Sequence, residues 1–324
     1  MKVKARIFVE GLVQGIGYRP FVYRIAVNRN LKGYVRNTGD AGVEIVVEGE
    51  RRDVESFIED LKEKKPPLAK YEKITITYEE YRGEHSDFRI IKSSKKRKST
   101  SSIIPPDLGI CEECIAEING EGRRKGYAFT SCINCGPRFT VIIELPYDRE
   151  TTTMSKFKMC DYCKKQYEDP LQRWYYAQTI CCPYCGPQLE VYSSKGERIE
   201  CEDPIKFVQD ELIKGKIVAI KGIGGVHIAC KTTDSEVIEK LRKKRGKKEK
   251  PLAIMSLNID RIREYAYVSE VEEKILKSYA RPIVLLKKKK PFPLAENLSP
   301  GLNTIGAVSY THLRAHETEA DLVC

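Results

Sequence analysis

Four Cys-x-x-Cys pairs between residues 111 and 185 constrain this chain more than any other feature. They form two copies of one sequence repeat. The pairs are 17 residues apart in the first unit and 18 in the second, and 24 residues separate the units. Both units end in Cys-Gly-Pro. A structural zinc ion prefers four thiolates in a tetrahedron, so a repeat of the whole unit favours one ion in each.

The sequence therefore predicts a zinc module over residues 111–192 with two closed four-cysteine sites. The predicted ligands are Cys111, Cys114, Cys132 and Cys135 for one ion, and Cys160, Cys163, Cys182 and Cys185 for the other. Cys181 adjoins the second set, but the spacing and the Cys-Gly-Pro match favour Cys182. Disulfides are the alternative; the first residues lack an apolar signal segment, which favours a reducing, cytoplasmic location. Closed sites leave no coordination position for water, so we expect them to be structural.

Residues 1–92 predict an α+β domain of the ferredoxin-like type. A strand (KARIFVEG), a glycine loop, a helix (FVYRIAVNRN), two strands, a helix over 51–64 and a last strand or pair give a βαββαβ order. The glycine loop lies between a strand and a helix N-terminus, where backbone N–H groups and the helix dipole suit a phosphate-sized anion. Arg19 lies at this junction, where its guanidinium can bind the same oxygens.

Two segments of this domain resemble the signatures of the acylphosphatases. VQGIGYRPF is similar to their phosphate-binding loop, and GYVRNTGDAGVEIVVEG is similar to their second signature, with Ala41 as an insertion. The resemblance implies that Arg19 holds the phosphate and that Asn37 orients the attacking water. The loop residues that it implies are Val13, Gln14, Gly15, Ile16, Gly17 and Tyr18. A surface role for Arg19 and a hairpin-turn role for Asn37 are the alternatives.

Residues 93–110 are basic, rich in Ser and Thr, and contain Pro-Pro, which predicts a linker. The net charge of +11 is concentrated in runs at 95–98, 242–250 and 287–290. Such runs suit a phosphate-bearing or acidic partner, and solvated surface is the alternative. No apolar run is long enough to span a membrane.

Residues 200–306 alternate between helical and strand patterns, which predicts an α/β nucleotide-binding domain. Its candidate ligands for a nucleoside triphosphate are Lys221, beside a glycine loop, and the cluster Lys244, Arg245 and Lys247. The Walker spacing is absent, so the pattern alone leaves nucleotide binding open. His227 follows the glycine loop and is interpreted as a core or cleft-wall residue, with a catalytic role as the alternative.

The segments INCGPRFTVI, YDRETTTMSKFKMCDYC and CCPYCGP resemble the zinc-finger region of the hydrogenase maturation carbamoyltransferases, the HypF family. KGIGGVHIACKTTD, KPLAIM and RPIVLL resemble the YrdC-like domain of the same family. Two departures stand out. Tyr176 replaces a histidine that is usual in the family, and Arg245-Gly246-Lys247 exchanges the charges of the usual Lys-x-Arg. Lysine and arginine are not equivalent as phosphate ligands.

This resemblance implies a carbamoyltransferase with acylphosphatase activity. Carbamoyl phosphate would be hydrolysed at the first site, and ATP, with Mg²⁺, would activate the carbamate as carbamoyl-adenylate in the YrdC-like domain. The carbamoyl group would then pass to the C-terminal cysteine of HypE, toward the cyanide ligands of the [NiFe] hydrogenase iron. The YrdC-like segment looks incomplete and the family's final domain is not seen, so we expect only the acylphosphatase step from this chain.

Residues 307–324 turn polar and depart from the family pattern, which predicts a foreign tail. On that interpretation His312, His316 and Cys324 are not metal ligands. Two other functions stay open. One is a stand-alone acylphosphatase, and the other is a zinc-based RNA-binding protein, which the basic charge permits.

Overall fold

The structure is a computed structural model that describes residues 1–39, 42–66, 68–94, 104–246, 249–309 and 322–323. The chain divides into two compact units, and we describe each by itself. The first comprises Met1–Leu108 and Glu112–Gly186, and the second comprises Gly109–Cys111 and Pro187–Cys324. Within the described ranges, no helix is both long and apolar enough to cross a membrane.

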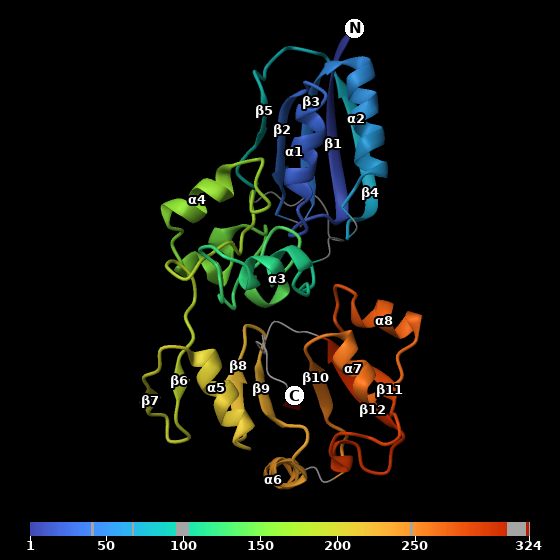
Figure 1. The fold of residues 1–324 in the computed structure, drawn as a ribbon. Helices are drawn as coiled ribbons and strands as arrows, with labels where there is room; N and C mark the ends of the chain where they lie inside the picture. The colour runs from blue at the N-terminus through green and yellow to red at the C-terminus, as the bar shows by residue number, and fades with distance from the viewer. Residues whose placement is uncertain (40–41, 67, 95–103, 247–248, 310–321, 324) are drawn as a thin grey trace. The chain divides into compact units, whose positions relative to one another are not determined.

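A mostly antiparallel sheet with two helices forms the N-terminal part of the first unit (Figure 1). Its order is β4-β1-β3-β2, with β5 added parallel to β2. The sheet and both helices share one buried apolar cluster, to which α2 contributes the stripe Val54, Phe57, Ile58 and Leu61. The bounds are β1 Lys2–Leu12, α1 Tyr18–Val27, β2 Lys32–Asn37, β3 Val43–Glu50, α2 Arg51–Glu63, β4 Lys70–Glu79 and β5 Phe88–Ile90. The ferredoxin-like prediction is confirmed; Ala41 lies outside the described residues.

The cysteine-rich part of the first unit has little regular structure. Its short helices are α3 Glu112–Asn119, η1 Phe139–Val141, η2 Arg149–Thr151, η3 Thr153–Lys156 and α4 Asp161–Glu168. Tyr175 belongs to the same buried cluster as the sheet. Leu108, at the end of the predicted linker, pairs with Gly136 through two backbone hydrogen bonds of 3.0 Å each. The sheet and the cysteine-rich segment therefore share one core, whereas residues 95–103 of the linker lie outside the described residues.

The second unit contains a mixed sheet in the order β11-β12-β10-β13-β9-β8, in which β10 and β12 are parallel. Its core includes side chains of α6, α7, β10 and β12. The bounds are β6 Val191–Tyr192, β7 Arg198–Ile199, α5 Pro204–Ile213, β8 Val218–Lys221, β9 Val226–Lys231, α6 Ser235–Arg245, β10 Ala253–Ser256, α7 Ile259–Tyr265, α8 Glu270–Leu276, β11 Val284–Lys287, η4 Glu296–Leu298, β12 Thr304–Ser309 and β13 Leu322–Val323.

Two features of this unit differ from the sequence expectation. The first residues of the predicted tail, Ala307 and Val308, are buried in β12; the other tail residues, apart from Ser309 and β13, lie outside the described ones. The basic run at 242–250 also begins inside the structure. Arg242 is buried, and its guanidinium donates to the carbonyls of Asn297, Lys250 and Leu298 at 2.8, 2.9 and 3.1 Å. Both roles expected for the basic run, a solvated surface and a contact with a partner, are therefore wrong for Arg242.

Candidate active site and zinc centres

The glycine loop turns the chain from β1 into α1. Gly15 and Gly17 have φ values of 69° and 75°, a left-handed conformation that glycine adopts without strain. A Cβ on Gly15 would also lie 2.8 Å from the Pro105 side chain. The Val13, Ile16 and Tyr18 side chains are buried in the apolar core, so these residues are available to a ligand only through their backbone. The helix that follows directs its N-terminus toward this loop, which suits an anion.

Arg19 and Asn37 converge on one oxygen beside the loop. Arg19 Nη2 and Asn37 Nδ2 donate to the carbonyl oxygen of Tyr147 at 3.3 and 3.2 Å. Both side chains are buried. Asn37 Oδ1 is buried as well and has no hydrogen-bond partner in the described part of the chain. The structure thus brings the two predicted catalytic residues together and leaves Asn37 Oδ1 without a donor among the described residues.

The cysteine-rich segment supplies the rest of this site. Asp148 Oδ1 forms an ion pair with Arg19 Nη1 at 2.9 Å. The Tyr176 ring lies 5.5 Å from the Arg19 guanidinium, close enough for a cation–π contact. The Tyr176 hydroxyl donates to the carbonyl of Ile90 at 3.2 Å, and burial raises the pKa of Tyr176. The residue that replaces the usual histidine therefore packs on Arg19 and remains a neutral phenol.

Gln14 connects three segments around the site. Its amide nitrogen donates to the carbonyls of Thr38 and Gly42, at 3.0 and 2.7 Å. Its amide oxygen accepts from the backbone N–H of Tyr147 at 3.0 Å. Gln14 is only 1% exposed, and both ends of its side-chain amide are bound within the protein. The spacing of residues in the glycine loop could not predict these contacts of Gln14.

Arg138 is a residue of this region that the sequence interpretation missed. It follows Cys-Gly-Pro in the first zinc unit and is buried. Its guanidinium donates to the carbonyl of Gly15 in the glycine loop and to those of Cys132, Ile133, Cys135 and Pro137 around the first metal site. One side chain therefore holds the loop against the zinc unit. An arginine directly after a predicted zinc-binding turn was the available signal.

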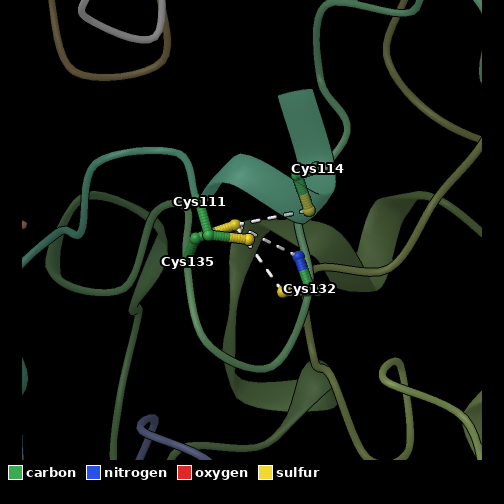
Figure 2. A group of neighbouring side chains, drawn as sticks. All are labelled: Cys111, Cys114, Cys132 and Cys135. Carbon is green, nitrogen blue, oxygen red and sulfur yellow. Dashed lines mark hydrogen bonds between the residues drawn. The ribbon is translucent and has the colours of Figure 1, made fainter. Parts of the chain in front are cut away.

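The first predicted zinc site is assembled in the structure (Figure 2). The ligand atoms of its four cysteines all lie within 4.8 Å of one another. The Cys132–Cys135 and Cys114–Cys135 sulfur distances are 3.8 and 3.5 Å. A tetrahedral zinc site with Zn–S bonds of about 2.3 Å has sulfur–sulfur edges of about 3.8 Å. The four sulfurs are therefore close enough together to hold one zinc ion.

The second site has the same geometry. Cys182 Sγ lies 3.8 Å from both Cys160 Sγ and Cys185 Sγ, and Cys163 Sγ lies 3.7 Å from Cys185 Sγ. All four ligand atoms lie within 4.8 Å of one another. Cys181 is outside this set: its thiol contacts the Tyr127 hydroxyl at 3.7 Å, and burial raises its pKa to about 11. The cysteines thus form two separate four-thiolate clusters, each suited to a structural zinc ion.

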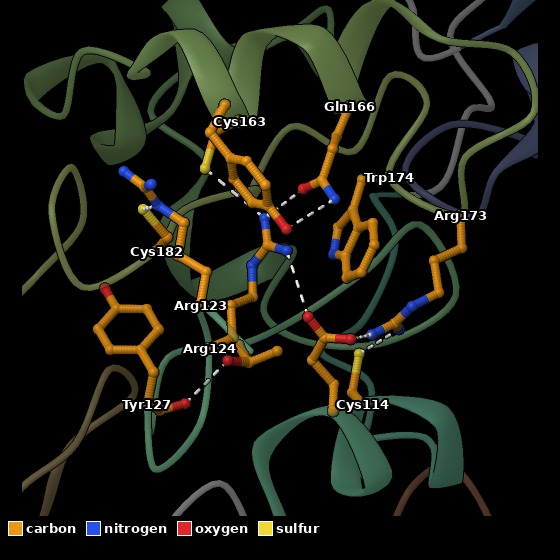
Figure 3. A network of polar contacts seen from close by, with 12 residues as sticks. Cys114, Arg123, Arg124, Tyr127, Cys163, Gln166, Arg173, Trp174 and Cys182 are labelled. Atoms are coloured by element: carbon orange, nitrogen blue, oxygen red, sulfur yellow. Dashed lines mark hydrogen bonds and ion pairs between the residues drawn. The ribbon is translucent and has the colours of Figure 1, made fainter. Parts of the chain in front are cut away.

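Each metal cluster is contacted by an arginine from the other zinc repeat (Figure 3). Arg123 and Arg173 each lie nine residues before the second cysteine pair of their own unit. Arg173, from the second zinc repeat, donates to Cys114 Sγ in the first cluster at 2.9 Å. Arg123, from the first zinc repeat, lies 3.4 Å from Cys182 Sγ and 3.9 Å from Cys160 Sγ in the second cluster. Four thiolates with one Zn²⁺ carry two negative charges, and this exchange offsets one of them in each cluster.

A stack of cations and one indole lies between the clusters. The guanidinium groups of Arg124 and Arg173 lie 4.2 and 3.9 Å from the Trp174 ring. Arg124 also donates to Cys163 Sγ at 3.6 Å, and both arginines pair with Glu117 at 3.5 Å. These contacts explain how the module packs with little regular secondary structure: charged side chains bind sulfurs, a carboxylate and a ring face.

The predicted nucleotide ligands are not joined by contacts as the catalytic and zinc-binding residues are. Lys221 is exposed at the end of β8, where its ammonium donates to the Gly222 carbonyl at 3.2 Å. Lys244 and Arg245 are exposed in the last turn of α6, and Lys247 lies outside the described residues. Among the residues that the structure describes, no hydrogen bond or ion pair joins Lys221 to this helix end. His227 is partly exposed in β9.

Three protein-family models match the chain in the predicted order. The acylphosphatase model matches residues 5–90, and the HypF finger model matches residues 110–142 and 159–192. The Sua5/YciO/YrdC model, described as telomere recombination, matches residues 210–317. The matches confirm the predicted combination of an acylphosphatase-like domain, a double four-cysteine module and a YrdC-like segment.

Similar proteins agree with these matches. The carbamoyltransferase HypF of Rhodobacter capsulatus is 40% identical over 95% of this chain and 40% of its own length. The probable carbamoyltransferase HypF of Methanocaldococcus jannaschii is 45% identical over the same shares of the two chains. A crystal structure of full-length HypF in a phosphate- and nucleotide-bound form is 39% identical, with a TM-score of 0.92 over 100% of this chain and 42% of that one. The chain, which spans about two fifths of the length of these relatives, belongs to the HypF family.

Proposed function

We propose that the first unit hydrolyses carbamoyl phosphate to carbamate and phosphate. The observation that carries this proposal is the convergence of Arg19 and Asn37 on one oxygen beside the glycine loop. Arg19 Nη1, which pairs with Asp148 in this structure, is the donor of the same guanidinium that suits a phosphoryl oxygen. Arg19 and the loop N–H groups stabilise the charge that develops on the phosphoryl oxygens. The unpartnered Oδ1 of Asn37 accepts a hydrogen bond from the attacking water.

Phosphate release from carbamoyl phosphate by the purified chain tests this proposal. We expect Arg19→Ala and Asn37→Ala each to lower kcat/KM by about 10²–10³, as the loss of a preorganised donor does. Arg52→Ala removes an equal charge from the exposed side of α2 and serves as the control. Hydrolysis that survives the Arg19 substitution at the control rate would contradict the assignment of the site.

For the whole protein, we propose the carbamoyltransferase activity for which its relatives are named, in the cytoplasm. ATP, with Mg²⁺, activates the carbamate as carbamoyl-adenylate in the YrdC-like domain, and the C-terminal cysteine of HypE receives the carbamoyl group. The match to the Sua5/YciO/YrdC model and the similarity to a nucleotide-bound HypF support the nucleotide step. Lys221, Lys244, Arg245 and Lys247 are the proposed nucleotide ligands.

ATP–pyrophosphate exchange in the full-length protein tests the second step. We expect exchange that depends on carbamoyl phosphate and falls in Lys221→Ala, while phosphate release from carbamoyl phosphate is retained. Exchange that is absent would favour a stand-alone acylphosphatase. Tight RNA binding with a steep salt dependence would favour the RNA-binding alternative.

A further inference from the structure

Two acceptors from the zinc module bind the Arg19 guanidinium. Its Nη1 pairs with Asp148 Oδ1 at 2.9 Å, and its Nη2 donates to the Tyr147 carbonyl at 3.3 Å. The Arg19 side chain is only 8% exposed. A phosphoryl group that uses this guanidinium therefore has to take over one of the two positions.

The two acceptors differ in how firmly they are held. The Tyr147 backbone is fixed, because its N–H is bound by Gln14, its carbonyl also accepts from Asn37, and its side chain is buried. The Asp148 side chain is 26% exposed and reaches solvent. Asp148 is also the acceptor that carries a negative charge, as a phosphoryl group does. The least costly exchange is therefore at Arg19 Nη1, where a phosphoryl group replaces the Asp148 carboxylate.

We propose that Asp148 is a positioning residue of the phosphate site: it holds the Arg19 guanidinium when no ligand is bound and gives it up to a phosphoryl group. The proposal rests on the proposed function, since it takes Arg19 as the phosphate ligand. A buried guanidinium without an anion is unfavourable, so Asp148 keeps Arg19 in place between turnovers. The ligand-free site then binds phosphate more weakly than Arg19 alone would allow, because the competing pair has to open first.

A second feature of the site points to a ligand. Asn37 Oδ1 is buried and unpartnered within the described residues, although Asn37 Nδ2 is bound to the Tyr147 carbonyl. Buried polar atoms in folded proteins are almost always paired. Asn37 Oδ1 therefore lacks a donor, and it belongs to the side chain that shares the Tyr147 carbonyl with Arg19.

Inorganic phosphate is the probe for this proposal, titrated calorimetrically into the purified chain. Asp148→Asn keeps the size of the side chain and remains a good residue at the start of the short helix η2. We expect its Kd for phosphate to fall by about tenfold, as for a site freed from an internal competitor. The KM for carbamoyl phosphate should fall with it, without a gain in kcat. Glu150→Gln removes an equal charge from an exposed residue of the same segment and should leave Kd within about twofold.

The outcomes separate this proposal from the proposed function. If wild type binds phosphate and Arg19→Ala does not, but Asp148→Asn binds phosphate equally or more weakly, Asp148 is no competitor and the proposal fails alone. If phosphate binding does not depend on Arg19, both fail. Asp148→Ser, another uncharged residue suited to a helix start, repeats the test if the asparagine variant is unstable. Unchanged thermal unfolding of the variants excludes a loss of structure as the cause.

Discussion

At the residue scale, buried guanidinium groups take the place of secondary structure around the site. Arg149 is buried and donates to the carbonyls of Gln178, Ile180 and Phe157, at 2.8, 2.8 and 2.6 Å. Arg138 does the same for the glycine loop and the first zinc unit. A backbone carbonyl buried without a donor costs about 1–3 kcal/mol. These arginines therefore stabilise loops that no helix or strand could satisfy.

Replacing Arg138 with lysine tests this role. Lysine keeps the charge but lacks the planar fork that reaches several carbonyls at once. We expect Arg138→Lys to lower the free energy of unfolding of the first unit by about 3 kcal/mol and to weaken phosphate binding. Urea unfolding measures the first effect. Arg82→Lys, at a side chain that is 68% exposed, is the control and should change stability little. Equal stability of the two variants would show that Arg138 is not structural.

Tyr167 makes stability depend on pH at the alkaline end. Burial raises its pKa to about 12, against 10.0 for an ordinary tyrosine. The folded state therefore keeps the phenolic proton in a range where the unfolded state loses it. Stability is unaffected by this group below about pH 10 and falls above it, by at most about 1.4 kcal/mol per pH unit. Tyr167→Phe should show a shallower fall of the urea midpoint between about pH 10 and pH 12; an unchanged slope would argue against it.

At the scale of elements, the sequence was informative wherever a periodic apolar pattern faced one core. The stripe of α2, the alternation along β1 and the order of the first unit could all be predicted in this way. The helices α7 and α8 were missed, since each is only 7 residues long. The Arg19–Asp148 pair and the arginine exchange between the zinc units join residues 129 and about 60 positions apart in the chain. No local pattern marks such contacts, so they needed the structure.

The arginine exchange predicts how each zinc ion is retained. Arg173→Gln removes the donor to Cys114, and Arg123→Gln removes the donors to Cys182 and Cys160. Loss of such outer contacts commonly weakens metal binding by about 10–100-fold. We expect each variant to release zinc to a chelator at least about tenfold faster, which a metal indicator dye follows. Lys165→Gln removes an exposed charge from α4 and should release zinc like wild type.

At the scale of the whole molecule, the catalytic candidates and seven of the eight predicted zinc ligands belong to one unit, and Cys111 and the YrdC-like segment belong to the other. Tyr175, from the second zinc unit, lies in the core of the ferredoxin-like sheet. Arg19 and Asn37 are both bound to Tyr147 of the module. Residues of the zinc module therefore line the proposed hydrolytic site.

Removal of zinc should consequently loosen the first unit more than the second. Structural zinc contributes folding free energy to the segment that binds it. With a chelator present, we expect hydrogen exchange to accelerate in peptides from 13–19 and from β2, while peptides from β10 and β12 exchange as before. Mass spectrometry of exchanged peptides measures both regions in one sample. Equal acceleration everywhere, or none in 13–19, would contradict the shared core.

The position of Trp174 has a practical consequence. It is the single tryptophan of the chain, and its indole is buried between two guanidinium groups with its N–H donated to the Ser131 carbonyl at 3.2 Å. Light absorbed by the indole alone therefore samples one spot, beside the two arginines that contact Cys163 and Cys114. Its fluorescence provides a built-in optical probe, so metal uptake can be followed in the intact chain without attaching a dye.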